Sequence, residues 1–478
     1  MMIPSEQPPR IIQGGMGVAV SNWRLANAVS STGNLGVVSG TMLDTVLVRR
    51  LQDGDVGGDL RRAIAHFPIP QVGDDVLRRY FKPGGRSPGT PYQLLPMYTR
   101  AVSPSRQRIT MLANFVEVWL AKAGHSGPVG INLLTKVQMP NLASLYGALL
   151  ADVDYVIMGA GIPREIPGML DALVTHAPAR MKFDVEGLGR DETEYLEFDP
   201  GIHWSAPPAP LRRPKFLAVV SASSLATTLA RKSNGRVDGF IVEASTAGGH
   251  NAPPRGELKL NLLGEPVYGD RDIVDLEKIR ELGVPFWLAG GAGSPGALRR
   301  AMDSGAAGIQ VGTLFAFCEE SGIAPEIKHL VLDAVRADEA SVFTDPLASP
   351  TGYPFKIVQV PDDPSDAPRE RVCDLGYLRV AVRAPNGRTL YRCAAEPADA
   401  YVAKGGELSD TVGRRCLCNG LTATVGLGQV RGSATEPPLV TSGDDLVNLP
   451  GFFDGSRPFR AADVVEFLIR GAPSRSTD

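Results

Sequence analysis

One histidine stands where its side chain could take part in a reaction. His250 follows the pair Gly248-Gly249, just after an apolar run that begins at Gly239. An imidazole has an unperturbed pKa close to neutral pH, so it can accept a proton or donate a hydrogen bond there. We therefore predict His250 as a catalytic residue rather than a structural one. A structural role is expected for the remaining histidines, His66, His125, His176, His203 and His329.

A second set of residues has the pattern of a phosphate site. Gly290-Gly-Ala-Gly293 precedes a helix-like stretch, and Gly312-Thr313 ends the next apolar run. Glycines let backbone N–H groups approach phosphate oxygens closely, and a helix N-terminus adds favourable partial positive charge. The alternative is that these glycines only permit tight turns. The order of the glycine pair, the helix and the Gly-Thr pair favours a phosphate site.

Two other groups of residues allow both a functional and a structural interpretation. Arg255 could orient an anionic substrate, or it could be a solvated loop residue. Cys373, Cys393, Cys416 and Cys418 share one late segment, and four thiolates can close a tetrahedral Zn²⁺ site. The Cys-x-Cys spacing is tighter than usual for zinc, so buried free thiols are the competing interpretation.

Strands that end side by side are needed to bring these residues together. Short apolar runs, each followed by a helix-like stretch, predict parallel strands buried on both faces. Eight such units predict an α/β fold, a closed (β/α)8 barrel, whose phosphate site commonly follows the last two strands. An open doubly wound sheet is disfavoured, because no Gly-x-Gly-x-x-Gly turn follows the first strand. The runs are residues 10–17, 34–40, 128–134, 154–161, 215–221, 239–245, 284–289 and 308–313.

The remaining length is expected to form an insertion, an extension and helices. We predict a barrel over residues 1–357 with an insertion at about 181–212, where a Pro-rich, acidic stretch interrupts the repeats. Residues 358–478 form a Cys-containing C-terminal extension, expected to cover the barrel mouth or to mediate contacts in a homodimer. Ser21 is expected to cap the first helix. Further helices are predicted near 109–120 and over 224–232, 272–282, 295–304, 314–337 and 461–469.

Composition limits the class of protein. The chain has 478 residues, 43% hydrophobic and 21% charged, so it can bury a large core. A net charge of −3 gives no electrostatic case for nucleic acid or an anionic membrane. The first ten residues lack the features of a signal peptide, and no apolar run is long enough to span a bilayer. Five cysteines in this length are not a disulfide framework. We expect a soluble cytoplasmic protein.

Six short segments together resemble the nitronate monooxygenases, formerly called 2-nitropropane dioxygenases. They occur in the family order within residues 8–357, and the resemblance implies a TIM barrel that binds FMN non-covalently. Two features depart from the family: Gln13-Gly-Gly-Met lacks a usual proline, and the insertion and extension are absent from short members. The segments are Ile12-Gln-Gly-Gly-Met-Gly17, Gly130-Ile-Asn132, Gly159-Ala-Gly161, Ala247-Gly-Gly-His250, Ala289-Gly-Gly291 and Val311-Gly-Thr313.

The resemblance also implies roles for individual residues. The FMN phosphate is expected at Gly290, Gly291, Gly312 and Thr313, and Gly293, Gly248 and Gly249 are counted with the cofactor site. Gly15, Met16, Gly17 and Asn132 are expected to face the isoalloxazine ring. His250 would deprotonate a nitroalkane or hydrogen-bond a nitronate. The implied reaction is oxidation of an alkyl nitronate with O2 to a carbonyl compound and nitrite, with no metal needed.

Three other functions share some of these features. A flavin-dependent enoyl-thioester reductase would share the barrel, the phosphate loops and a rim histidine, but would use NAD(P)H. An inosine-monophosphate-dehydrogenase-like barrel needs a nucleophilic cysteine after its sixth strand, where this chain has His250, so it is rejected. A barrel without catalysis, acting through its extension as an interaction module, would take up no FMN.

Overall fold

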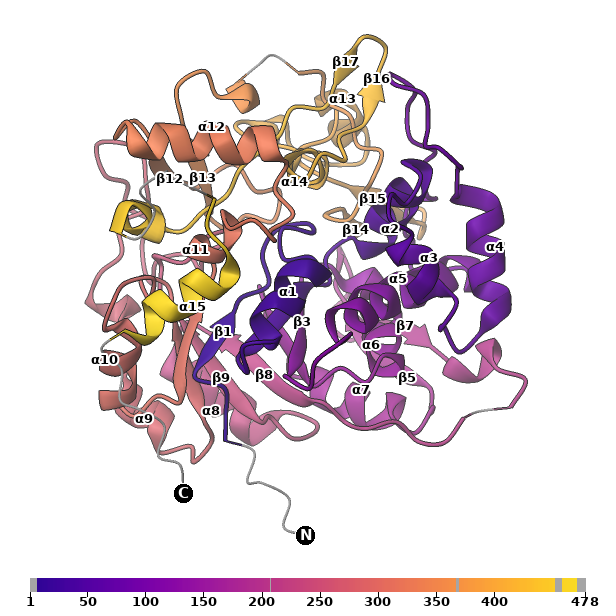
Figure 1. Cartoon of the computed structure of the whole chain (residues 1–478). Helices are drawn as coiled ribbons and strands as arrows, with labels where there is room; N and C mark the ends of the chain where they lie inside the picture. The colour runs from indigo at the N-terminus through magenta and orange to yellow at the C-terminus, as the bar shows by residue number, and fades with distance from the viewer. Residues whose placement is uncertain (1–6, 207, 367–368, 452–457, 471–478) are drawn as a thin grey trace.

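The eight predicted strands close into one barrel (Figure 1). The computed structural model describes residues 7–206, 208–366, 369–451 and 458–470. The strands are all parallel and run in the order β1-β2-β3-β4-β8-β9-β10-β11 before closing back onto β1. The predicted (β/α)8 fold is therefore confirmed. The strand bounds are β1 Ile11–Gln13, β2 Leu35–Ser39, β3 Val129–Leu134, β4 Tyr155–Gly159, β8 Lys215–Val220, β9 Gly239–Glu243, β10 Phe286–Ala289 and β11 Gly308–Val311.

Apolar side chains fill the inside of the barrel. Ile12, Leu35, Ile157, Ile241 and Trp287 are almost fully buried and pack together as one cluster. The indole N–H of Trp287 donates to the carbonyl of Pro9 at 2.6 Å, so this large side chain leaves no buried donor unpaired. The interior is thus a packed core, and space for a ligand is left at the end of the barrel where the strands finish.

Helices surround the barrel, and some differ from the predicted bounds. Two short helices replace the single one predicted over 314–337. Gly322 lies too close to the Ala19 carbonyl for any side chain, and Pro325 starts a new helix because it lacks an N–H. The bounds are α1 Trp23–Ser30, α5 Pro104–Ala121, α6 Gln138–Leu150, α7 Ile166–Leu173, α8 Ser223–Lys232, α9 Leu276–Arg280, α10 Ala297–Asp303, α11 Thr313–Ala316 and α12 Pro325–Arg336.

The residue that caps α1 is not the predicted one. Asn22 is the N-cap, and its side chain accepts from the Leu25 N–H at 3.0 Å. Ser21 instead turns inward, where its Oγ donates to the Gly14 carbonyl at 2.9 Å and accepts from the Met16 N–H at 3.0 Å. Ser21 therefore fixes the loop after β1 rather than the helix.

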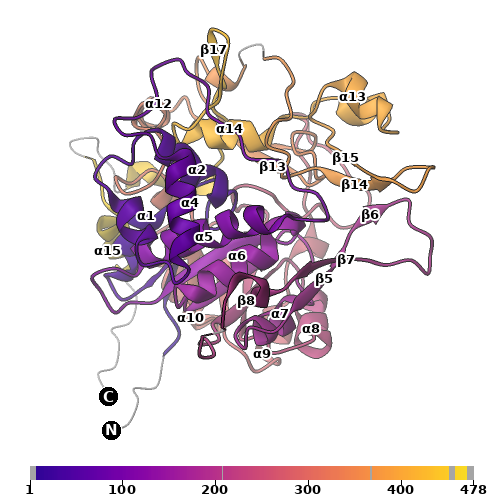
Figure 2. The same ribbon diagram turned by 90° about the vertical axis from the view of Figure 1, so that its right-hand side faces the viewer.

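The long connection between β2 and β3 is helical. It forms α2 Leu43–Gln52, α3 Asp59–Ile64 and α4 Pro70–Tyr80 before α5. These helices stand beside the barrel, above α6 in Figure 2. The connection is closed against α5 by buried pairs such as Phe67 and Phe115, whose rings lie 5.2 Å apart. It forms a helical layer at one side of the barrel mouth.

The insertion and the extension meet in a shared sheet. Between β4 and β8, β5 (Ala179–Phe183) and β7 (Glu194–Phe198) form an antiparallel pair outside the barrel. The short β6 (Val185–Glu186) pairs with β14 (Val380–Arg383), which in turn pairs with β15 (Thr389–Arg392). Figure 2 shows these strands together at the upper right. Two segments far apart in the sequence thus hold each other in place.

The rest of the extension lies over the barrel mouth. Figure 1 shows α14 (Leu417–Thr424) above the barrel and α15 (Ala461–Ile469) beside α1. Helix α15 has the predicted bounds and packs against α1, α10 and α11. Among the described residues, no helix is long and apolar enough to cross a membrane. The other elements are β12 Ser341–Asp345, β13 Phe355–Gln359, α13 Ala398–Ala403, β16 Val430–Arg431 and β17 Ala434–Thr435.

Candidate functional site

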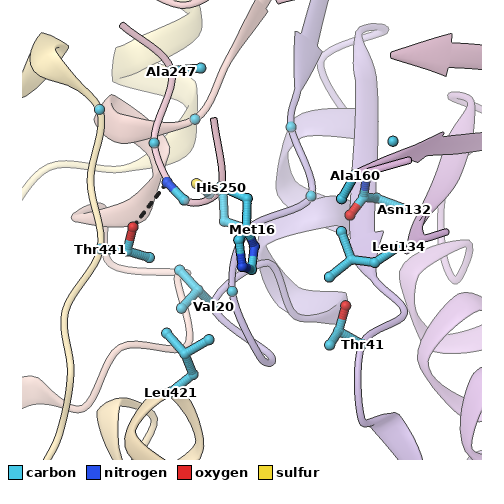
Figure 3. Close-up of a pocket in the computed structure, with 18 of the residues that line it drawn as sticks. Met16, Val20, Thr41, Asn132, Leu134, Ala160, Ala247, His250, Leu421 and Thr441 are labelled. Carbon is cyan, nitrogen blue, oxygen red and sulfur yellow. Dashed lines mark hydrogen bonds between the residues drawn. The ribbon is translucent and has the colours of Figure 1, made fainter. Parts of the chain in front are cut away.

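A large cavity lies at the C-terminal ends of the barrel strands. Its volume is about 1520 Å³, counted with its opening to solvent. Its walls come from the loops after β1, β3, β4, β9, β10 and β11, and from the extension. Figure 3 shows Asn132 and Leu134 on one side of it, Ala247 and His250 on the other, and Leu421 and Thr441 contributed by the extension. This is the end of a barrel at which enzymes of this fold bind substrates.

Most of the predicted site residues line this one cavity. Gly291, Gly293 and Arg255 do not line it, and of the four late cysteines only Cys418 does. Residues separated by up to 298 positions in the sequence (15 to 313) therefore meet at one place, as the sequence-based interpretation requires. Those that line the cavity are Gly15, Met16, Gly17, Asn132, Gly248, Gly249, His250, Gly290, Gly312 and Thr313.

The loop after β1 is held by buried polar contacts. Gln13 is fully buried at the end of β1, and its amide donates to Ser21 Oγ at 2.8 Å and accepts from the Val37 N–H at 3.1 Å. Ser39 Oγ donates to the Gly17 carbonyl at 2.6 Å. These contacts present the loop backbone to the cavity. A flat ring could lie against such a surface, because Gly14, Gly15 and Gly17 carry no side chains and all three line the cavity.

Gly15 cannot carry a side chain in this arrangement. A Cβ there would lie 2.4 Å from Asn132 Cβ, so the loop or Asn132 would have to move. We expect Gly15→Ala to lower the free energy of unfolding by about 1–3 kcal/mol and to reduce the amount of bound flavin. Urea unfolding and the visible spectrum measure the two effects. Gly269→Ala is the control, because a Cβ there meets open space; equal behaviour of the two variants would contradict this account.

His250 is held by an aromatic wall and a hydroxyl pair. Its Nε2 lies 2.7 Å from Ser349 Oγ, which lies 2.8 Å from Thr351 Oγ1. Its ring meets Phe355 edge-on, with centroids 4.9 Å apart. Gly249, with φ 75°, turns the chain so that the histidine follows at the cavity wall, and the Gly249 N–H donates to Thr441 Oγ1 at 3.0 Å (Figure 3). The imidazole is thus positioned by residues from the segment that follows the barrel.

Burial lowers the pKa of His250 to about 4. The imidazole is therefore neutral in the folded protein at neutral pH. A neutral ring with so low a pKa is a weak base but a good hydrogen-bond partner for an anion. Such an imidazole is better suited to forming a hydrogen bond than to taking up a proton.

This pKa predicts a dependence of stability on pH. In the unfolded chain the imidazole of His250 has a pKa near 6.5, whereas in the folded protein it becomes protonated only near pH 4. The stabilisation is present above about pH 6.5 and is lost as the pH falls towards 4. His203, whose pKa burial also lowers to about 4, contributes a similar loss to both proteins. At pH 5 we therefore expect wild type to lose about 2 kcal/mol more than His250→Gln. Urea unfolding of both proteins at pH 7.5 and pH 5 measures it; parallel losses would contradict the lowered pKa.

The extension occupies part of the predicted phosphate cradle. The Gly293 N–H donates to Asp445 Oδ2 at 2.9 Å, and the Gly443 N–H donates to Thr313 Oγ1 at 2.9 Å. A carboxylate therefore stands at the start of the loop into α10, and Gly293 is not open to a ligand. Gly290 and Gly312 remain on the cavity wall. The cradle fits a phosphate at these two glycines but not at Gly293, which corrects the sequence-based prediction there.

Arg255 is tied to the outside of the barrel. Its guanidinium donates to the carbonyls of Arg271 at 2.7 Å and Ser221 at 2.6 Å, and its own N–H donates to Asp272 at 2.9 Å. These contacts join three loops on an exposed surface. The structure therefore supports the structural interpretation of Arg255 that the sequence left open.

The four late cysteines come together, but not as the predicted zinc ligands. Cys373, Cys393, Cys416 and Cys418 line one small second cavity. Within the described ranges, no group of three or more His, Cys, Asp or Glu side chains could hold a metal ion. The structure thus does not provide the tetrahedral zinc site predicted from the sequence.

Several cavity residues were not found from the sequence. Glu243 ends β9 and lines the cavity, and burial raises the pKa of its carboxyl to about 7. A charged residue at the end of an otherwise apolar strand is a signal that could have identified it. Tyr377, Leu378 and Leu421 come from the extension, and no pattern in the sequence indicated that they would reach the barrel mouth.

Comparisons with known proteins agree on one family. Residues 201–346 match the family model described as nitronate monooxygenase. Probable nitronate monooxygenases of Bacillus subtilis (strain 168) and Staphylococcus saprophyticus are 31% identical over 122 residues and 30% over 139 residues. The aligned parts cover 25% and 29% of this chain and 32% and 36% of the relatives, so the chain matches about a third of their length.

Two solved structures are similar over nearly the whole chain at low identity. FabK from Thermotoga maritima is 15% identical with a TM-score of 0.47, covering 97% of this chain and 92% of that one. A nitroalkane oxidase from Streptomyces ansochromogenes is 15% identical with a TM-score of 0.44, covering 96% and 94%. At these values they carry no argument about function. The part of the chain that is similar to nitronate monooxygenases, residues 201–346, contains His250 and the ends of β9, β10 and β11.

Proposed function

We propose that this protein is an FMN-dependent oxidoreductase that oxidises alkyl nitronates with O2 to a carbonyl compound and nitrite. The observation that carries the proposal is the meeting of His250 with the glycine-rich ends of β1, β10 and β11 around one cavity. The family match over residues 201–346 supports it, because that segment supplies the histidine and two of the three glycine-rich ends.

The cavity walls suit a flavin in two places. The backbone of Gly15, Met16 and Gly17, facing Asn132, would lie against the isoalloxazine ring. Gly290, Gly312 and Thr313 would approach the phosphate. When bound, FMN supplies the electron transfer and the reaction with O2. The protein contributes binding, orientation and an environment with little water.

His250 is proposed to orient the substrate. With Nε2 in its hydrogen bond to Ser349, Nδ1 is the nitrogen left for a nitronate oxygen. If Ser349 Oγ donates to Nε2, Nδ1 carries the proton and donates to the anion. The neutral ring does so without losing a proton, in keeping with its lowered pKa. The apolar side chains of Val20, Leu134 and Phe355 would contact the alkyl part of the substrate.

A direct test uses the purified full-length protein. It is expected to be yellow, to carry FMN, and to release nitrite from a nitronate under air. Mixing the oxidised protein anaerobically with a nitronate, and separately with NADH, identifies the electron donor. Reduction by NADH and not by the nitronate would instead indicate the flavin-dependent enoyl-thioester reductase reaction. Colourless protein that takes up no FMN would overturn both.

A further inference from the structure

Four cysteines of the extension surround a cavity that the proposed oxidation does not use. The cavity has a volume of about 300 Å³, counted with its opening, and its other walls include Pro350, Leu375 and Ala395. Cys373 and Cys393 come from either side of the β14–β15 hairpin, and Cys416 and Cys418 from the start of α14. Separate elements of the extension thus bring their cysteines to the same cavity. The four thiols are Cys373, Cys393, Cys416 and Cys418.

The four thiols are grouped around this cavity without a disulfide between them. Cys393 and Cys418 are buried, and Cys373 and Cys416 are partly buried. Thiolates gathered in this way are costly to form, unless a cation shares their charge.

One of the four sulfurs has a side-chain hydrogen-bond donor beside it. The side-chain amide of Asn419 lies 3.5 Å from Cys416 Sγ. Such a donor stabilises a thiolate and tunes a metal bound to it.

The spacing of the thiols distinguishes between two kinds of occupant. A single ion needs its four sulfurs about 2.3 Å from one point, and no three ligands of the described chain are grouped to hold a metal ion. In a [4Fe–4S] cluster each cysteine sulfur binds a different iron, so the sulfurs stand farther apart around a central space. Here they stand around a cavity walled mainly by apolar residues. We propose that Cys373, Cys393, Cys416 and Cys418 hold an iron–sulfur cluster.

The surroundings supply charge of the right sign. Arg379 lines the cavity, and its guanidinium donates to the carbonyls of Gly376 and Tyr98, which leave its positive charge in place. Glu396, next to Ala395 of the cavity wall, has the opposite charge but is bridged to Lys404 at 2.7 Å. A cluster with four thiolates is anionic, so the arginine stabilises it.

The cluster site adjoins the main cavity. Leu378, Leu417 and Cys418 line both cavities, so a single layer of side chains separates them. A cluster at this position would also fix the extension over the barrel mouth. This proposal does not depend on which substrate the main cavity binds, and its test has a separate readout.

The test measures iron, acid-labile sulfide and zinc in full-length protein purified without oxygen. About four irons and four sulfides per chain are expected, with an electron paramagnetic resonance signal after reduction by dithionite. Cys373→Ser and Cys393→Ser should lose most of the iron. Cys318→Ser is the matched control, because Cys318 is buried elsewhere with its Sγ 3.1 Å from the Phe315 carbonyl, and it should keep the wild-type iron content.

A second measurement covers variants that fail to fold. Wild-type protein is stripped of metal and then supplied without oxygen with ferric iron, sulfide and excess dithiothreitol, which reduces part of the iron to the ferrous state. Recovery of iron and sulfide in equal amounts is expected. One zinc per chain without labile sulfide would overturn the cluster in favour of a mononuclear site. Absence of iron from both the anaerobic and the reconstituted wild type would overturn it altogether. Flavin content of the same samples, determined from released FMN, reports on the proposed oxidation independently.

Discussion

Replacing His250 by alanine is expected to lower kcat/KM for a nitronate about 10- to 100-fold, because a hydrogen bond to a charged group contributes about 1.5–3 kcal/mol. The imidazole stands on the cavity wall between Ser349 and Phe355, and no other histidine lines this cavity. FMN content should change little, since the residues proposed to hold the cofactor are other residues of the cavity wall, mainly glycines. The measurement is nitrite release over a range of nitronate concentrations, with bound flavin determined for each sample.

The same variant separates two roles of the imidazole. If His250 orients the anion, activity falls with the preformed nitronate. If it acts only as a base, the loss appears with the neutral nitroalkane and not with the nitronate. His329→Ala is the control, because His329 is exposed on α12, and it should behave as wild type. Full activity of His250→Ala with the nitronate would exclude the orienting role that we favour.

The barrel and most of its cavity could be predicted, because short sequence patterns indicate each strand and the residues at its end. Each strand of the barrel is a short apolar run that ends in, or is directly followed by, glycine or a polar residue. Parallel strands finish at the same end of a barrel. Once eight such runs are ordered, Gly15, Asn132, His250 and Gly312 must lie near one another. No contact between distant side chains has to be known for this step.

What the sequence did not reveal depends on contacts between distant segments. Gly293 has the right neighbours for a phosphate loop, but Asp445, 152 residues later, takes its N–H. The cysteines were visible as a set, yet their spacing around a cavity follows from how β14, β15 and α14 pack. The pKa of His250 likewise depends on burial by residues of the segment after the barrel, which sequence patterns do not encode.

Removal of Asp44 is expected to have the largest effect on stability. Asp44 and Arg106 form an ion pair at 2.9 Å, with side chains only 2% and 6% exposed. Tyr98 donates to the same carboxylate at 2.5 Å, and Tyr377 also donates to it. Asp44→Ala would leave a buried guanidinium without its counter-charge and would remove the carboxylate acceptor of two phenols. We expect the free energy of unfolding to fall by about 3–5 kcal/mol, measured by urea unfolding.

An exposed pair provides the control for this loss. Asp75 and Arg78 lie 2.7 Å apart, but their side chains are 65% and 71% exposed, so Asp75→Ala should change stability by less than about 1 kcal/mol. Similar losses of unfolding free energy in the two variants would show that the buried pair stabilises the fold no more than the exposed pair does.

The buried pair is also connected to the main cavity through Tyr377. Tyr377 lines that cavity, and its hydroxyl donates to Asp44. Asp44→Asn, which keeps the shape of the side chain, should therefore also alter the wall that the extension builds over the barrel mouth, and weaken nitronate binding more than Asp75→Ala does.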